Sequence, residues 1–190
     1  MAKSKKILIF DHQLTGHHLE YLHHLYIGAK QDKINTYLFA LPEGFDTQSE
    51  LKWKKAVNIE FYLFKDRTFS SNTIKRSFKL SKFVKKIALQ YDADEIFFVS
   101  LMSVLPAISF VSLRSIKISG IIYLIYLYRW KELNLKLKIE DSIKYLLISH
   151  SKQFKTVFLL NDEVAPFYLN KKFKTKVFQY LPDPFVPLPR

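Results

Sequence analysis

Short runs of β-branched and aromatic residues recur along the whole chain, and segments of helical periodicity separate them. The runs lie at residues 5–11, 34–41, 57–64, 95–100, 118–126, 156–161 and 176–181. Helices are expected at 17–30, near 48–55, at about 72–91, at 101–110, at 138–150 and from 162 to 169. Such alternation is typical of parallel strands that are joined by crossover helices.

Several of these runs are apolar on both faces, as strands are when helices cover both sides of a sheet. Right-handed crossovers then give an α/β fold. We expect a Rossmann-like, doubly wound, mostly parallel sheet of about seven strands with helices on both faces.

The end of the chain has a different composition. The stretch LPDPFVPLPR holds four of the seven prolines, so it suits neither a central strand nor a helix interior. The 190 residues therefore predict one domain at 1–181, followed by a proline-rich linker at 182–190 that leads out of it.

The charge of the chain selects a class of partner. Thirty Lys and Arg against 17 Asp and Glu give a net charge of +13, which attracts nucleic acid, nucleotide phosphates or an acidic membrane. The absence of cysteine excludes disulfides and thiolate metal sites and fits a reducing compartment. The first apolar run ends at Asp11, too early for a secretory signal. We expect a cytoplasmic protein.

The stretch FDHQLTGHHLEYL at 10–22 joins the first expected strand to the first helix. Gly16 allows a positive φ and close approach of a ligand, and the start of a helix attracts anions. His17 and His18 fall on the first helical turn, where they can bind a phosphate or move a proton, or can simply be polar residues. We expect Glu20 and Tyr21 to face outward.

Two other kinds of site fit this stretch poorly. The next glycine after Gly16 is Gly28, so the dinucleotide fingerprint G-x-G-x-x-G is absent. The helical histidines never recur at a spacing of three or four residues, the spacing that makes helical side chains neighbours. We expect neither a metal nor a bound cofactor.

The helix expected at 72–91 is basic, and no acidic residue occurs from 67 to 91. Such a one-signed face can bind anionic lipid, nucleic acid or nothing beyond solvent. No helix-turn-helix, zinc finger or RNP-type motif supports nucleic acid. The residues expected to bind an anionic membrane are Lys75, Arg76, Lys79, Lys82, Lys85 and Lys86.

Three features together resemble the amino-terminal half of a family 4-like glycosyltransferase of the two-domain GT-B fold. These are ILIFDHQLTGHHLEYL, the alternating strands and helices, and VFLLNDEVAPFYLNKKFKTKVFQYLPDPF, which looks like a last strand entering an interdomain hinge. The resemblance covers nearly the whole chain. It departs from the family in its single first-loop glycine and in the lack of a His or Asp after the fourth strand.

The resemblance implies an acceptor-binding domain whose partner domain, absent here, binds most of a nucleotide-sugar donor. By that resemblance Gly16 lies beside the donor diphosphate, and His17 or His18 lines the cleft. Ser100, Ser103 and Arg129 are implied on the acceptor side. The activity implied is transfer of a sugar, with retention and without a metal, to a glycan or lipid-linked acceptor in surface polysaccharide or glycolipid synthesis. This chain alone is then expected to be inactive.

Two other functions stay open. One is a non-catalytic basic module that binds anionic membrane or nucleic acid, which the charge of +13 favours. The other is a small α/β enzyme with a nucleotide cofactor, which the lone Gly16 disfavours. For the transferase, the basic helix predicts a peripheral location at the inner face of the cytoplasmic membrane.

Overall fold

A computed structural model of the protein describes residues 3–45, 53, 56–65, 72–113, 115–123 and 134–183. Its described strands form one sheet of seven strands in the order β3-β2-β1-β4-β5-β6-β7, and every pair of neighbours is parallel. The predicted Rossmann-like, doubly wound α/β fold is therefore confirmed.

Each predicted strand has its counterpart in the sheet. The strands are β1 (Lys6–Phe10), β2 (Thr36–Pro42), β3 (Ile59–Phe64), β4 (Glu95–Phe98), β5 (Lys117–Ile122), β6 (Phe154–Leu160) and β7 (Phe178–Leu181). The fifth run was expected to extend to residue 126, and its last residues lie outside the described part of the chain.

The helices of the described residues are α1 (His18–Gln31), α3 (Thr73–Tyr91), α5 (Leu135–His150) and α6 (Val164–Phe173). The helix expected at 101–110 is instead two 3₁₀ turns, η1 (Leu101–Ser103) and η2 (Ala107–Phe110). The interruption includes Pro106, which lacks the N–H that a continuous helix needs. The short helix expected near 48–55 and the linker from 184 lie outside the described residues.

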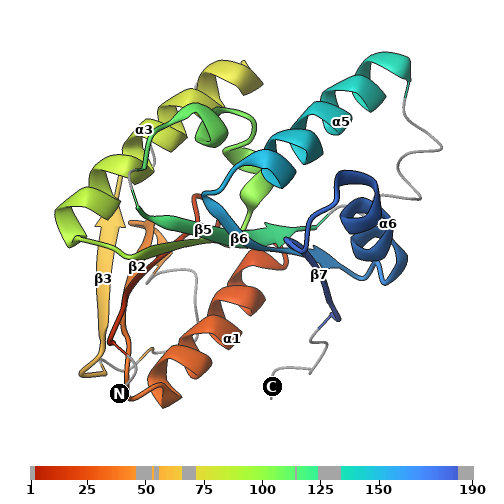
Figure 1. Ribbon diagram of the computed structural model, residues 1–190. Helices are drawn as coiled ribbons and strands as arrows, with labels where there is room; N and C mark the ends of the chain where they lie inside the picture. Colours follow the sequence, from red (N-terminus) through yellow and green to blue (C-terminus); the bar gives the residue numbers. More distant parts are fainter. Residues whose placement is uncertain are drawn as a thin grey trace.

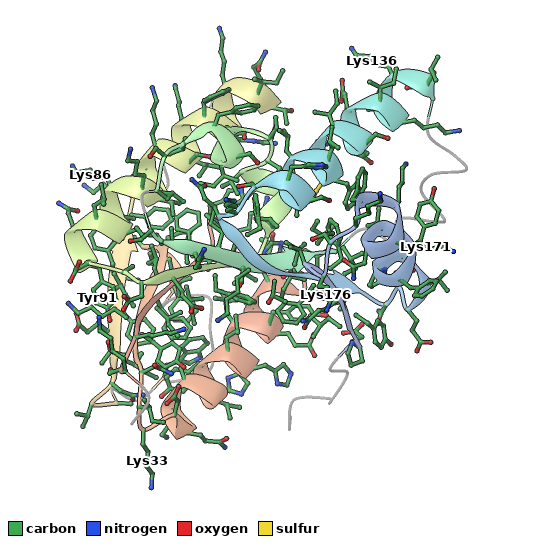
Figure 2. The ribbon with its side chains drawn as sticks, in the orientation of Figure 1. Lys33, Lys86, Tyr91, Lys136, Lys171 and Lys176 are labelled. Carbon is green, nitrogen blue, oxygen red and sulfur yellow. The ribbon has the colours of Figure 1, made fainter. Side chains whose placement is uncertain are left out.

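The sheet separates two apolar layers. Figure 1 shows α3 and α5 on one side of the sheet and α1 on the other. The first layer packs Leu80 and Val84 of α3 with Ile148 of α5, and the second packs Leu22 and Tyr26 of α1 against the sheet. Charged side chains such as Lys33, Lys86 and Lys136 extend from the outside of the molecule (Figure 2).

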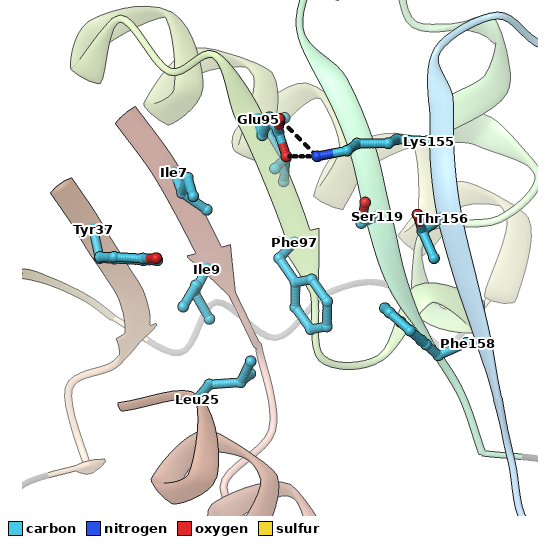
Figure 3. A pocket seen from close by; sticks show the side chains of 11 residues that line it. Ile7, Ile9, Leu25, Tyr37, Glu95, Phe97, Ser119, Lys155, Thr156 and Phe158 are labelled. Carbon is cyan, nitrogen blue, oxygen red and sulfur yellow. Dashed lines mark hydrogen bonds and ion pairs between the residues drawn. The ribbon is translucent and has the colours of Figure 1, made fainter. Parts of the chain in front are cut away.

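Part of the α1 side of the sheet is hollow. A pocket of about 260 Å³ lies over β1, β4, β5 and β6, with Ile9, Phe97 and Phe158 on its apolar floor (Figure 3). A neighbouring groove of about 480 Å³ continues from it under α1. The pocket reaches Glu95 and Lys155 at one end, and the groove reaches Tyr21 and Leu181 at the other.

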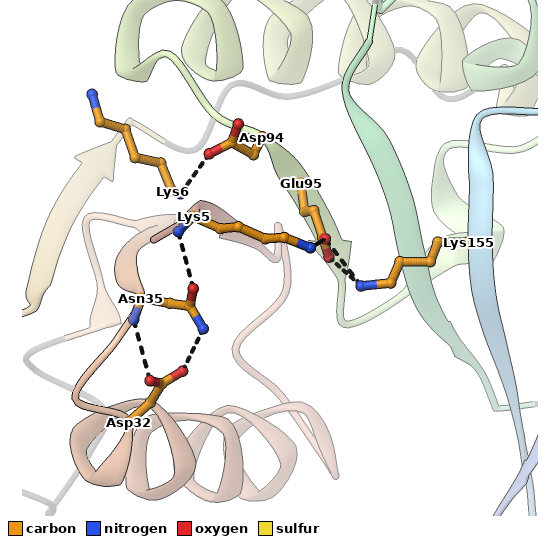
Figure 4. A network of polar contacts seen from close by, with 7 residues as sticks. All are labelled: Lys5, Lys6, Asp32, Asn35, Asp94, Glu95 and Lys155. Carbon is orange, nitrogen blue, oxygen red and sulfur yellow. Dashed lines mark hydrogen bonds and ion pairs between the residues drawn. The ribbon is translucent and has the colours of Figure 1, made fainter. Parts of the chain in front are cut away.

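The amino edge of the sheet is held by ion pairs that join strands distant in sequence (Figure 4). Glu95 of β4 pairs with Lys5, which precedes β1, and with Lys155 of β6 at 2.9 Å. Burial by itself raises the pKa of Glu95, but the two lysines outweigh it and the pKa is lowered. These contacts fix the edge opposite the one that carries the candidate site.

Of the four glycines, Gly120 of β5 has the least room for a side chain. A Cβ added there would lie 2.7 Å from the carbonyl oxygen of Phe98 and 3.2 Å from Cβ of Leu101. We expect Gly120→Ala to lower the free energy of unfolding by about 1–3 kcal/mol, as overpacking does. Urea titration measures this, with Gly28→Ala as the control, because no atom beyond the adjacent backbone of α1 lies within 4 Å of a Cβ added there. Equal stability of the two variants would contradict the packing described here.

Candidate functional site

The candidate site lies where the direction of winding reverses. From β1 the chain moves to β2 and β3 on one side, and it then returns to β4 on the other side of β1. In open α/β sheets this switch point, at the carboxyl ends of the strands, is where ligands bind. Asp11 follows β1 directly, and its amide donates to the carbonyl oxygen of Ala40 at 3.3 Å.

Asp11 is a buried carboxylate with hydrogen-bond partners on both of its oxygens. Its Oδ1 accepts the amide N–H groups of His12 at 2.7 Å and of Gln13 at 3.1 Å. Its Oδ2 lies 2.6 Å from Nδ1 of His18. The turn after β1 thus folds around this side chain, and the first residue of α1 is fixed to the end of β1.

The contact with Asp11 assigns the two ring nitrogens of His18. A carboxylate only accepts hydrogen bonds, so Nδ1 donates and the neutral ring carries its lone pair on Nε2. The His18 side chain is 15% exposed, which leaves it accessible at the edge of the sheet. A buried Asp that orients a His in this way is the arrangement that makes imidazole a proton acceptor.

The structure separates the two histidines that the sequence left as alternatives. His17 is the N-cap residue of α1, its side chain is 71% exposed, and its Nδ1 lies 3.7 Å from Glu20. Gly16 before it has φ +66°, the conformation expected for this turn, and it places His18 rather than His17 against Asp11. His18 is therefore the stronger candidate.

Two tyrosines pack next to His18, Tyr123 directly against its ring and Tyr21 against Tyr123. The ring of Tyr123, just after β5, lies 5.2 Å from the His18 ring and 5.3 Å from that of Tyr21. Tyr21 was expected to face outward, but this expectation is wrong because Tyr21 is buried against Tyr123. Its hydroxyl donates to Asp183 at 2.9 Å, which ties the chain after β7 to α1.

Burial raises the pKa of the Tyr123 hydroxyl, and the Asp11 carboxylate raises it further. An acid whose pKa is raised by folding stabilises the fold below its unfolded value, here 10.0, and this contribution is lost as the pH rises above it. We expect the unfolding free energy to fall above pH 10, and to fall less in Tyr123→Phe. Urea titration on both sides of that pH measures this. An identical fall in the two proteins would contradict the assignment.

Of the implied acceptor-side residues, Ser100 and Ser103 lie within the described part of the chain, and neither hydrogen-bonds to Asp11 or His18 there. Ser100 precedes η1, just beyond the carboxyl end of β4, which is the switch-point edge. The hydroxyl of Ser103 donates to the carbonyl oxygen of Ser100 at 2.7 Å, so it supports the local turn. Arg129 lies outside the described residues.

The basic helix is confirmed as α3, and its charges differ in exposure. Lys75, Lys79, Lys82 and Lys86 are exposed, whereas Arg76 and Lys85 are half-buried. Among the described residues, no helix has the length and apolar character to cross a membrane. Nor do they contain a group of three or more His, Cys, Asp or Glu that could hold a metal ion.

Sequence reasoning missed Asp11, which it treated only as the residue that ends an apolar run. The available signal was an Asp at the end of the first strand with a glycine turn and a His at the helix start, seven residues later. The chain matches no protein-family model and no curated protein sequence. Function is therefore inferred from the site itself.

Proposed function

We propose that this chain is the acceptor-side domain of a glycosyltransferase that moves a sugar from a nucleotide-sugar donor to a glycan or lipid-linked acceptor. The observation that carries the proposal is the Asp11–His18 pair at the switch point of the sheet, with Nδ1 and Oδ2 2.6 Å apart. Hydroxyl groups are weak nucleophiles, and transfer to them requires a group that takes up a proton.

In the proposed reaction the acceptor oxygen forms a bond to the anomeric carbon of the donor sugar. The bond from that carbon to the diphosphate breaks, and its electron pair leaves with the diphosphate. In a single displacement the hydroxyl proton passes to Nε2 of His18, and Asp11 stabilises the imidazolium that results. The turn at Gly16 and the start of α1 favour the negative charge that develops on the departing diphosphate.

The stereochemistry separates two roles for His18. A single displacement with His18 as the base inverts the configuration at the anomeric carbon. The retention implied by the resemblance would instead use His18 to accept a hydrogen bond and orient the acceptor hydroxyl. The anomeric configuration of the product, read from proton couplings, distinguishes these roles.

The test of the proposal is a transfer assay with the full-length product of the gene. The gene is read past codon 190, and the whole protein and this chain are assayed side by side with a panel of nucleotide sugars. The proposal expects sugar release by the longer protein and none by this chain, since the donor half is supplied by the second domain. A stop codon at position 191, or a longer protein without any transfer, would overturn it.

The exposed lysines of α3 favour a second candidate, a binding module without chemistry. Four lysines on one helix gain about 1 kcal/mol each beside anionic lipid. In the transferase proposal the same charge brings the protein from the cytoplasm to the inner face of the membrane, where a lipid-linked acceptor lies. Vesicle or oligonucleotide binding by a full-length protein that transfers no sugar would favour the binding module.

A further inference from the structure

Helix α5 is apolar on two faces, but only one of them packs against the protein. Tyr145 and Ile148 are buried in the core on its inner face. On the outer side, Leu135, Ile139, Ile143 and Leu146 are between 44% and 74% exposed. These four residues, the α5 stripe, follow one another at spacings of four, four and three, so they form one line along the helix.

The α5 stripe continues into a groove of about 400 Å³ between α5 and α6. All four stripe residues line the groove, and Phe173 lies on its α6 side. Apolar side chains supply most of the lining, and the stripe from Leu135 to Leu146 extends about 17 Å along the helix at 1.5 Å per residue. Such a contiguous exposed apolar surface marks a place of interaction.

The charges around the groove indicate what it contacts. Lys138 and Lys172 are among its lining residues, which include no acidic side chain. Figure 2 shows Lys136 at the outer end of α5 and Lys171 on α6. A second copy of this chain would bring like charges together, since the chain carries +13. An anionic bilayer offers an apolar interior to the α5 stripe and negative headgroups to Lys138 and Lys172.

We infer that the α5 stripe and the α5–α6 groove form the surface by which this protein inserts into the interface of an anionic phospholipid bilayer. The basic helix α3 lies on the same side of the sheet (Figure 1) and adds attraction at longer range. The sequence alone indicated α3 as the membrane contact, whereas the structure assigns the apolar contact to α5. The inference does not depend on sugar transfer.

Co-sedimentation with vesicles tests this inference on the chain as it is. The vesicles contain phosphatidylglycerol and phosphatidylcholine in equal parts, and pure phosphatidylcholine vesicles serve as the neutral reference. We expect binding to the anionic vesicles that is at least about tenfold stronger than to the neutral ones. We expect the double variant Ile139→Glu with Ile143→Glu to bind the anionic vesicles at least about tenfold more weakly than the unaltered protein.

The matched control is the double variant Phe78→Glu with Leu89→Glu on α3. These side chains are 39% and 41% exposed, and the substitutions add the same charge. We expect this control to weaken binding by less than about threefold, because it alters only the longer-range attraction. Circular dichroism and thermal unfolding check that both variants fold.

Three results would overturn the inference. They are absence of binding by the unaltered protein, equal loss in the two variants, and a larger loss in the α3 variant. Vesicle binding through α5 by a full-length protein that transfers no sugar would leave this inference standing and remove the proposed function.

Discussion

Replacing His18 with alanine is expected to lower the rate of sugar transfer by the full-length protein about 10²–10⁴-fold, the range typical of a lost proton-transfer group. The reason is the contact of 2.6 Å between its Nδ1 and Oδ2 of Asp11, which leaves Nε2 as the acceptor for the hydroxyl proton. The measurement is the initial rate at saturating donor for the unaltered protein and the variant.

His17→Ala is the matched control for this prediction. It removes the same side chain from the adjacent position, where the imidazole is 71% exposed and does not contact Asp11. We expect the rate of this variant to stay within about threefold of the unaltered protein, as surface changes do. Equal losses in the two variants would show that His18 has no special part in the reaction.

Replacing Asp11 with alanine is expected to lower the free energy of unfolding by about 2–5 kcal/mol. The carboxylate is buried and accepts from the amides of His12 and Gln13 as well as from His18. Its removal leaves three donors without this acceptor at the start of the turn. Urea titration of the isolated chain measures the loss.

Asp162→Ala separates loss of stability from loss of function. Asp162 is also buried, and it accepts the amide of Ala165 at 2.8 Å at the start of α6. This variant is expected to be destabilised, as is typical when a capping carboxylate is lost, while keeping the His18 contact and its transfer rate. An Asp11→Ala protein as stable as the unaltered one would contradict the role given to this carboxylate.

The sheet could be predicted because its signals are local. Each strand is a short apolar run, and alternation with helices is enough to indicate parallel order. Helix boundaries are harder to predict than strands. Helix α5 begins at Leu135 rather than at 138 because the side chain of Asn134 accepts the amide of Leu137. A cap of this kind depends on one side chain, which periodicity does not detect.

The site could be predicted only in part, because its contacts depend on the fold. Gly16 and the pair of histidines marked the correct turn, but His17 and His18 differ by one residue and the direction of α1 decides between them. Tyr21 is buried because Tyr123 and Asp183, more than a hundred residues away in sequence, pack against it. Single-sequence patterns contain no signal for such long-range contacts.

Asp11 holds the neutral His18 ring with its proton on Nδ1 and its lone pair on Nε2. Long-range ¹H–¹⁵N correlation spectra of the isolated chain, labelled at histidine, measure this tautomer directly. The spectra are recorded above the pH at which the ring loses its charge. We predict the Nδ1–H form for His18, its loss in Asp11→Ala and its retention in Asp162→Ala. An Nε2–H form of His18 in the unaltered protein would contradict the role given to Asp11.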